Sequence, residues 1–134
     1  MLRSLENKVA WVTGAGTGIG EAGATALAEA GMHVVLSGRR IEKLEEVASQ
    51  CGDAVSIEML DVANRDAVTE VAQRIIQTHG RIDVPVASAG INVKKRNWHN
   101  VSLDDWDSVI RIDLDGAFYC CLLYTSDAAD EHSW

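Results

Sequence analysis

A glycine-rich segment near the start of the chain constrains its fold more than any other feature. The segment runs from Thr13 to Gly20 (TGAGTGIG), follows the apolar residues 9–12 and opens a stretch with helical periodicity. Gly14 can form the turn that leaves a strand, whereas Gly18 and Gly20 have no Cβ to hold a phosphate or the strand away from the helix. The segment predicts a nucleotide site, although an ordinary strand-to-helix loop would also explain it if it stood alone.

Strand and helix patterns alternate along the rest of the chain. Short apolar or β-branched runs predict strands, and between them apolar residues recur at helical spacing. The alternation predicts a parallel sheet with helices on both faces, in which the glycine turn lies at the ligand crevice. The predicted strands cover residues 8–13, 32–37, 55–60 and 82–87, and a further helix begins at the capping sequence of residues 102–105.

Composition argues against several classes of protein. The 12 Lys and Arg against 20 Asp and Glu give a formal net charge of -8, which argues against a nucleic-acid or anionic-membrane partner. No apolar stretch approaches the roughly 20 residues that span a bilayer, and the N-terminal residues lack a hydrophobic secretion segment, so we expect a cytoplasmic protein. The three cysteines and four histidines show no ligand spacing, so we predict neither a metal site nor a disulfide framework.

Four segments, in the right order, resemble the compact single-domain branch of the short-chain dehydrogenases/reductases. Residues 13–20 match the TGxxxGIG motif of that family, Asp61 and Val62 its acidic residue after the third strand, residues 89–91 the end of its NNAG motif, and residues 106–118 its next helix. The resemblance implies a three-layer, Rossmann-like α/β fold. Its doubly wound parallel sheet would be truncated here after the fourth strand and the following helix.

The residues after the second predicted strand bear on the choice of cofactor. Sites that select NAD place a carboxylate roughly 20 residues past the glycines, where it bonds the ribose 2′-OH. Here the strand runs into Arg39 and Arg40, whose guanidinium groups suit a 2′-phosphate. The sequence therefore favours NADP over NAD. The alternative is that both arginines only begin a solvated helix.

The resemblance implies the remaining contacts with the cofactor. It sets Asp61 against the adenine amino group, Val62 beside the adenine ring, and Ala89 and Gly90 near a ribose. The predicted cofactor-binding residues are Thr13, Gly14, Thr17, Gly18, Ile19, Gly20, Arg39, Arg40, Asp61, Val62, Ala89 and Gly90.

Asp113 stands where the family has a helix asparagine, a position that helps to hold a water and the active-site lysine. Trp106, Ile110, Asp113 and Ala117 are spaced 4, 3 and 4 apart and share one helix face, which we expect to point inward. An acid among apolar neighbours is costly unless it is paired or hydrogen-bonded, so Asp113 is a catalytic candidate. The alternative is that helix drift or a solvent channel exposes it.

The proton-transfer residues of the family do not occur in this chain. Members transfer a hydride at the nicotinamide C4, with a tyrosine as acid or base, a lysine that lowers its pKa, and a serine that orients the oxygen. Tyr119 and Tyr124 are followed four positions later by Leu123 and Ala128, so neither begins a Tyr-x-x-x-Lys pair. We interpret residues 1–120 as the cofactor-binding half of an NADP-dependent oxidoreductase that acts on a small carbonyl or alcohol and is homo-oligomeric when complete. The alternative is a nucleotide-binding or inert fragment.

The last residues have a separate interpretation. Cys121 to Glu131 (CLLYTSDAADE) has no apolar period and resembles the translation of a transposase-adapter sequence used in DNA library preparation. We expect natural sequence to end near Cys120 and residues 121–134 to be an artefactual tail. The alternative is a real polar C-terminal tail.

Overall fold

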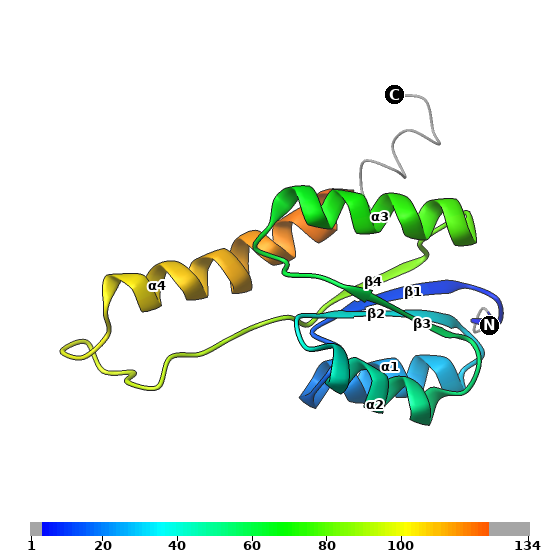
Figure 1. Cartoon of the computed structure of the whole chain (residues 1–134), viewed down its shortest axis with the longest axis horizontal. Coiled ribbons are helices and arrows are strands. Elements are labelled where there is room, and N and C mark those ends of the chain that lie inside the picture. Colours follow the sequence, from blue (N-terminus) through cyan, green and yellow to red (C-terminus); the bar gives the residue numbers. More distant parts are fainter. Residues whose placement is uncertain (1–3, 124–134) are drawn as a thin grey trace.

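The computed structural model describes residues 4–123, in which four parallel strands form one sheet with helices on both faces (Figure 1). Residues 117–123 continue the last helix. The three-layer α/β fold is as predicted, and each predicted strand agrees with the observed one to within two residues at either end. The elements are β1 (Val9–Thr13), α1 (Gly18–Glu29), β2 (His33–Gly38), α2 (Ile41–Cys51), β3 (Val55–Met59), α3 (Arg65–His79), β4 (Val84–Ala87), α4 (Leu103–Val109) and the π-helix η1 (Ile110–Gly116).

The strand order places the crevice of the fold beside β1. The order is β3-β2-β1-β4, and every pair is parallel. These are the first four strands of the doubly wound order 3-2-1-4-5-6, in which the chain direction across the sheet reverses between β1 and β4. Ligands of such sheets bind outside the carboxyl ends of the strands at this reversal. The turn after Thr13 lies at that end of β1.

Alternate residues of β1 supply the two hydrophobic cores. All five residues of the strand are buried, as expected for a parallel strand covered on both faces. Val9 and Trp11 pack into the core under α3, whereas Ala10 and Val12 pack into the core over α1 and α2. Figure 1 shows α1 and α2 on one side of the sheet and α3 on the other. This double burial explains why the sequence shows a continuous apolar run before the glycines.

The prediction that one face of the last helix, with Trp106 and Asp113, points inward is wrong. Trp106 is 52% exposed and Asp113 is also exposed, while Ile112, Gly116 and Cys120 turn toward the α3 core. The physical reason is the π-helix, whose wider turns rotate the buried face relative to a 3.6-residue period. In addition, α4 projects beyond the carboxyl ends of the strands (Figure 1), and none of its residues is buried.

Two other sequence predictions concern the ends of this helix. Ser102 caps α4 as predicted, because its Oγ accepts a hydrogen bond of 3.0 Å from the Asp105 N–H. Most of the predicted tail, residues 124–134, lies outside the described residues. Among residues 4–123, no helix combines the length and the apolar character that a bilayer span requires.

A buried hydrogen bond ties β1 to β2 inside the sheet. The indole Nε1–H of Trp11 donates to Ser37 Oγ over 2.9 Å, and both residues are at most 1% exposed. A buried donor that loses its acceptor costs about 1–3 kcal/mol, because water cannot replace the lost partner.

We predict that Ser37→Ala lowers the free energy of unfolding by about 1–3 kcal/mol, since it leaves the Trp11 indole N–H without an acceptor. Urea unfolding followed by circular dichroism measures the change. Ser56→Ala is the matched control, because Ser56 is exposed on β3, and it should change stability by less than about 0.5 kcal/mol. Equal effects of the two variants would contradict the importance of the Trp11 hydrogen bond.

Candidate functional site

A pocket, here called the crevice pocket, lies outside the carboxyl ends of the strands, where α1 and α2 begin. Eight of the twelve predicted cofactor residues line it: Gly14, Thr17, Arg39, Arg40, Asp61, Val62, Ala89 and Gly90. Four predicted residues do not line it: Thr13, Gly18, Ile19 and Gly20. Residues up to 98 positions apart, Gly14 and Ile112, therefore meet at one site, as the topology of the sheet requires.

The glycine turn brings three pieces of backbone unusually close together. Gly14 has a φ of +64°, and a Cβ there would lie 2.7 Å from the backbone N and Cα of Ala89. A Cβ on Gly20 would collide with the carbonyl oxygen of Gly14. Both positions therefore need glycine so that β1, the start of α1 and the segment after β4 can meet.

Gly18 has a different environment from the other two glycines. Its φ is +60°, but a Cβ would meet no described atom within 4 Å. The neighbouring Ile19 is 85% exposed, and Thr17, the N-cap of α1, makes no side-chain capping hydrogen bond. The start of α1 is thus uncapped and open, and such a helix end attracts anions. Thr13 is 3% exposed and does not line the pocket, and its hydroxyl donates to the Val86 carbonyl oxygen over 3.4 Å.

Three cationic side chains line the crevice pocket. Arg39 and Arg40 are exposed, and within residues 4–123 neither guanidinium makes a side-chain hydrogen bond or an ion pair. Lys43, which the sequence reasoning missed, is the third, and its Nζ lies 3.3 Å from Glu46 Oε2. The signal for Lys43 was its position three residues after Arg40, the N-cap residue of α2, which places it within one helical turn.

Part of the lining of the crevice pocket is apolar. Val62 is 5% exposed and Leu60 is 4% exposed, and both line the pocket. Asp61 between them is exposed, and its Oδ1 accepts a hydrogen bond of 3.0 Å from the Ala63 N–H. Leu44 and Ile112 add further apolar surface that the motifs did not predict. The wall can accept a flat apolar ring beside a polar edge.

Asp113 does not line the crevice pocket but holds a residue that does. Its Oδ1 accepts a hydrogen bond of 2.8 Å from the backbone N–H of Ile91, across 22 positions of sequence. Gly90 lies beside the same carboxylate, because a Cβ there would be 3.5 Å from Asp113 Oδ1. Asp113 is exposed, as the alternative interpretation had it. Its hydrogen bond ties η1 to the backbone after β4.

Cys120 lies in the hydrophobic core and does not line the crevice pocket. It is 2% exposed in the α3 core, and burial raises the pKa of its thiol to about 11. The thiol therefore stays protonated at neutral pH, and the thiolate is the reactive form of cysteine.

Comparison with known proteins identifies the family to which this architecture belongs. A family model described as short chain dehydrogenase matches residues 8–132, and the chain belongs to this family. An uncharacterized oxidoreductase of Staphylococcus aureus (strain USA300) is 44% identical over 126 residues, which are 93% of this chain and 52% of that protein. An uncharacterized oxidoreductase of Staphylococcus saprophyticus is 34% identical over 119 residues, 88% of this chain and 48% of that protein. The chain spans about half the length of the curated relatives it matches.

Two solved structures show the same fold. A short chain dehydrogenase from Bacillus anthracis superposes with a TM-score of 0.90 at 32% identity, over 95% of this chain and 54% of its own. A 3-ketoacyl-(acyl-carrier-protein) reductase from Brucella melitensis, solved in complex with NADH, gives a TM-score of 0.82 at 32% identity, over 87% of this chain and 48% of its own.

We predict that Gly18→Val abolishes nucleotide binding in a protein of full family length that contains this sequence. Valine at a φ of +60° is strained, and its side chain would occupy the open space at the start of α1. NADPH fluorescence titration measures the affinity, and circular dichroism checks that the fold persists. Gly23→Val is the control, since Gly23 lies within α1, has no positive φ and has equally open surroundings. A Gly18→Val protein that is folded and binds NADPH normally would contradict the site.

Proposed function

We propose that this chain is the cofactor-binding half of an NADP-dependent oxidoreductase that transfers a hydride between the nicotinamide and a small carbonyl or alcohol substrate. The observation that carries the proposal is the crevice pocket itself, which joins a glycine turn and an uncapped helix start to three cations. Family membership supports the oxidoreductase activity. Because the Brucella relative was solved with NADH, the choice of NADP rests on Arg39 and Arg40 alone.

The residues of the crevice pocket fit the parts of a dinucleotide. The turn at Gly14 and the N-terminus of α1 would hold the pyrophosphate, and the guanidinium groups would pair with a 2′-phosphate dianion. Asp61 and Val62 would flank the adenine, while Ala89 and Gly90 would lie against a ribose. When bound, the cofactor supplies the hydride. The residues of this chain bind and orient it.

The complete protein needs more than this chain provides. A proton donor must stand beside the substrate oxygen, and no tyrosine here has a lysine four positions later. We propose that the remaining half supplies the serine and the Tyr-x-x-x-Lys pair, and that the complete protein works in the cytoplasm. The sequence of the full-length gene distinguishes this function from the alternative, which is a fragment that binds a nucleotide without catalysis or is inert. A full-length sequence without these residues would favour the alternative.

We also propose that the complete protein is a homo-oligomer. Large apolar side chains are exposed along α4, η1 and the helical residues that follow: Leu103 is 82%, Leu114 is 60% and Phe118 is 58% exposed. Apolar surface that recurs along one projecting helix is a common feature of protein interfaces.

We predict that Arg39→Asp in the full-length protein shifts the cofactor preference from NADPH toward NADH. The substitution replaces a charge-assisted partner of the 2′-phosphate with a repulsive carboxylate. Hydrogen bonds to charged groups are worth about 1.5–3 kcal/mol, so we expect a change of about tenfold or more in the ratio of kcat/KM values. Arg65→Asp, an equal change of charge at the exposed start of α3, is the control. An unchanged ratio in the Arg39 variant would make Arg39 an ordinary surface residue.

We predict that the 134-residue chain, produced as it stands, is catalytically silent and only marginally folded. It lacks the general acid of the reaction, and within the described residues the outer edge of β4 has no neighbouring strand. The measurements are NADPH oxidation with a panel of ketones and aldehydes, and a thermal melt. Clear turnover, or a cooperative monomeric transition at ordinary mesophile temperatures, would contradict this prediction.

A further inference from the structure

Strand β4 and the loop after it have an unusual charge for this protein. The whole chain carries a net charge of -8, yet residues 84–103 contain no Asp or Glu at all. The same segment contains Lys94, Lys95 and Arg96 in succession. Three adjacent cations thus gather positive charge on this loop, next to the acidic first turn of α4 with Asp104 and Asp105.

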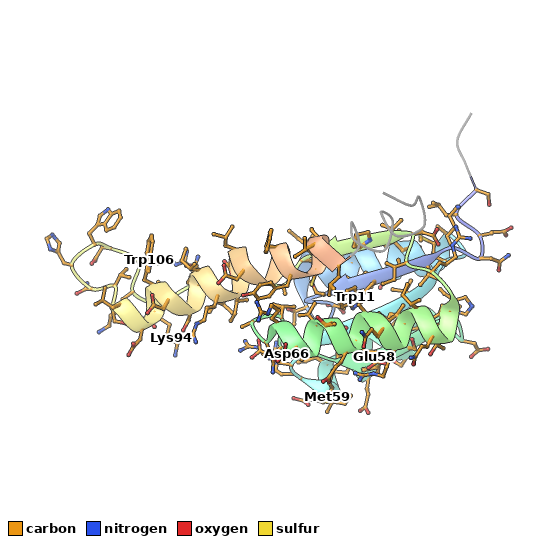
Figure 2. All side chains as sticks on the ribbon, turned by 90° about the horizontal axis from the view of Figure 1, so that it is seen from above. Trp11, Glu58, Met59, Asp66, Lys94 and Trp106 are labelled. Carbon is orange, nitrogen blue, oxygen red and sulfur yellow. The ribbon has the colours of Figure 1, made fainter. Side chains whose placement is uncertain are left out.

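This segment forms the wall of a second pocket, here called the loop pocket. Its polar lining includes Asn92, Lys94, Lys95, Asn100 and Ser102. The loop pocket adjoins the crevice pocket, because Ile91 lines both of them. In Figure 2, Lys94 lies on the arm that the loop and α4 form, apart from Trp11 in the sheet.

The position of the loop in the fold relates it to the reaction. The loop leaves the carboxyl end of β4, the strand that pairs with β1 at the reversal of the sheet. A ligand seated next to a dinucleotide in this crevice would meet the chain that leaves β4. Asp113 fixes the start of this chain through the Ile91 N–H at 2.8 Å.

The polar groups of the loop pocket favour an anion. Within residues 4–123, neither Lys94 nor Lys95 forms an ion pair or a side-chain hydrogen bond. Asn92 uses its Oδ1 to accept from the Val93 N–H, which leaves its amide N–H groups to donate to a ligand. Ser102 Oγ likewise accepts from the Asp105 N–H and keeps its own hydrogen to donate. The Asp105 carboxylate also lines the pocket, so two positive charges oppose one negative charge.

We infer that the loop pocket binds an anionic group of the substrate, and that Lys94 and Lys95 are its specificity-determining residues. This inference rests on the proposed function. It makes the substrate a carbonyl or hydroxy compound that also carries a carboxylate or a phosphate. The anionic group sits in the loop pocket, and the reacting carbon faces the crevice pocket.

The test uses the full-length protein with matched pairs of carbonyl compounds that differ in charge. Keto acids are compared with their methyl esters, and dihydroxyacetone phosphate is compared with dihydroxyacetone, so that the two arms separate carboxylate from phosphate. We expect a higher kcat/KM for the anionic member of at least one kind of pair. Lys94→Gln or Lys95→Gln should reduce that preference about tenfold or more, because each removes a charged hydrogen-bond donor.

Arg96→Gln is the matched control, since Arg96 belongs to the same cationic run but does not line the loop pocket. It should leave the preference within about twofold, because an exposed charge outside the pocket contributes little. Turnover that is indifferent to charge, or that responds equally to the Arg96 and lysine variants, would overturn the inference while the proposed function stands.

A second measurement separates this inference from the proposed function. If the protein is folded but turns over no compound, the proposed function fails. Calorimetric titration with acetoacetate and with inorganic phosphate then tests whether the loop pocket binds an anion. Binding that is lost in both lysine variants and kept in Arg96→Gln supports an anion site. No binding, or binding that ignores the lysines, overturns it.

Discussion

The close approach of three backbone segments at the glycine turn governs the rest of this structure. Gly14 can lie against Ala89 only because neither a Cβ nor a bulkier turn separates them, and Gly20 lets α1 begin directly over the Gly14 carbonyl. The crevice pocket is the space that this crossing leaves open on its outer side. A change in the turn would move a pocket wall as well as a loop.

A side chain holds β1 and β4 together at the end opposite the glycine turn. Asp83 Oδ2 accepts a hydrogen bond of 2.8 Å from the Val9 N–H, one residue before β4 begins. Burial alone would raise the pKa of Asp83, but hydrogen bonds from Arg81 and Val9 outweigh burial and lower it. The carboxylate therefore stays ionised at neutral pH, and the pairing of β1 with β4 is fixed at both ends.

Local sequence patterns predict the parts of this fold that depend on short-range chemistry. The buried runs at β1 and β2 and the capping serine of α4 follow from periodicity and from hydrogen-bonding groups only a few residues apart. The glycine turn also has a local signature, since a left-handed backbone favours glycine. The motif residues that line the crevice pocket could be proposed for the same reason, because each one lies in the connection that follows a strand.

Patterns of fixed period fail where tertiary packing changes the helix itself. The spacing of Trp106, Ile110 and Asp113 suggested one buried face, but η1 widens the turns between Ile110 and Gly116. Gly116 then packs against Val62, where a Cβ would lie 2.5 Å from Val62 Cγ2. The hydrogen bond from Ile91 to Asp113 belongs to the same rearrangement, and neither contact could be derived from residues close together in the chain.

The distribution of charge links the two pockets. Five of the 12 Lys and Arg residues line them: Arg39, Arg40, Lys43, Lys94 and Lys95. Because the chain has a net charge of -8, its overall field does not attract anions. These cations therefore attract an anion only at short range, within the two pockets that they line. The two groups flank the glycine turn, one after β2 and one after β4. On the proposed function, the cations of the crevice pocket would pair with the cofactor and those of the loop pocket with the substrate, so that hydride transfer would take place between the two groups.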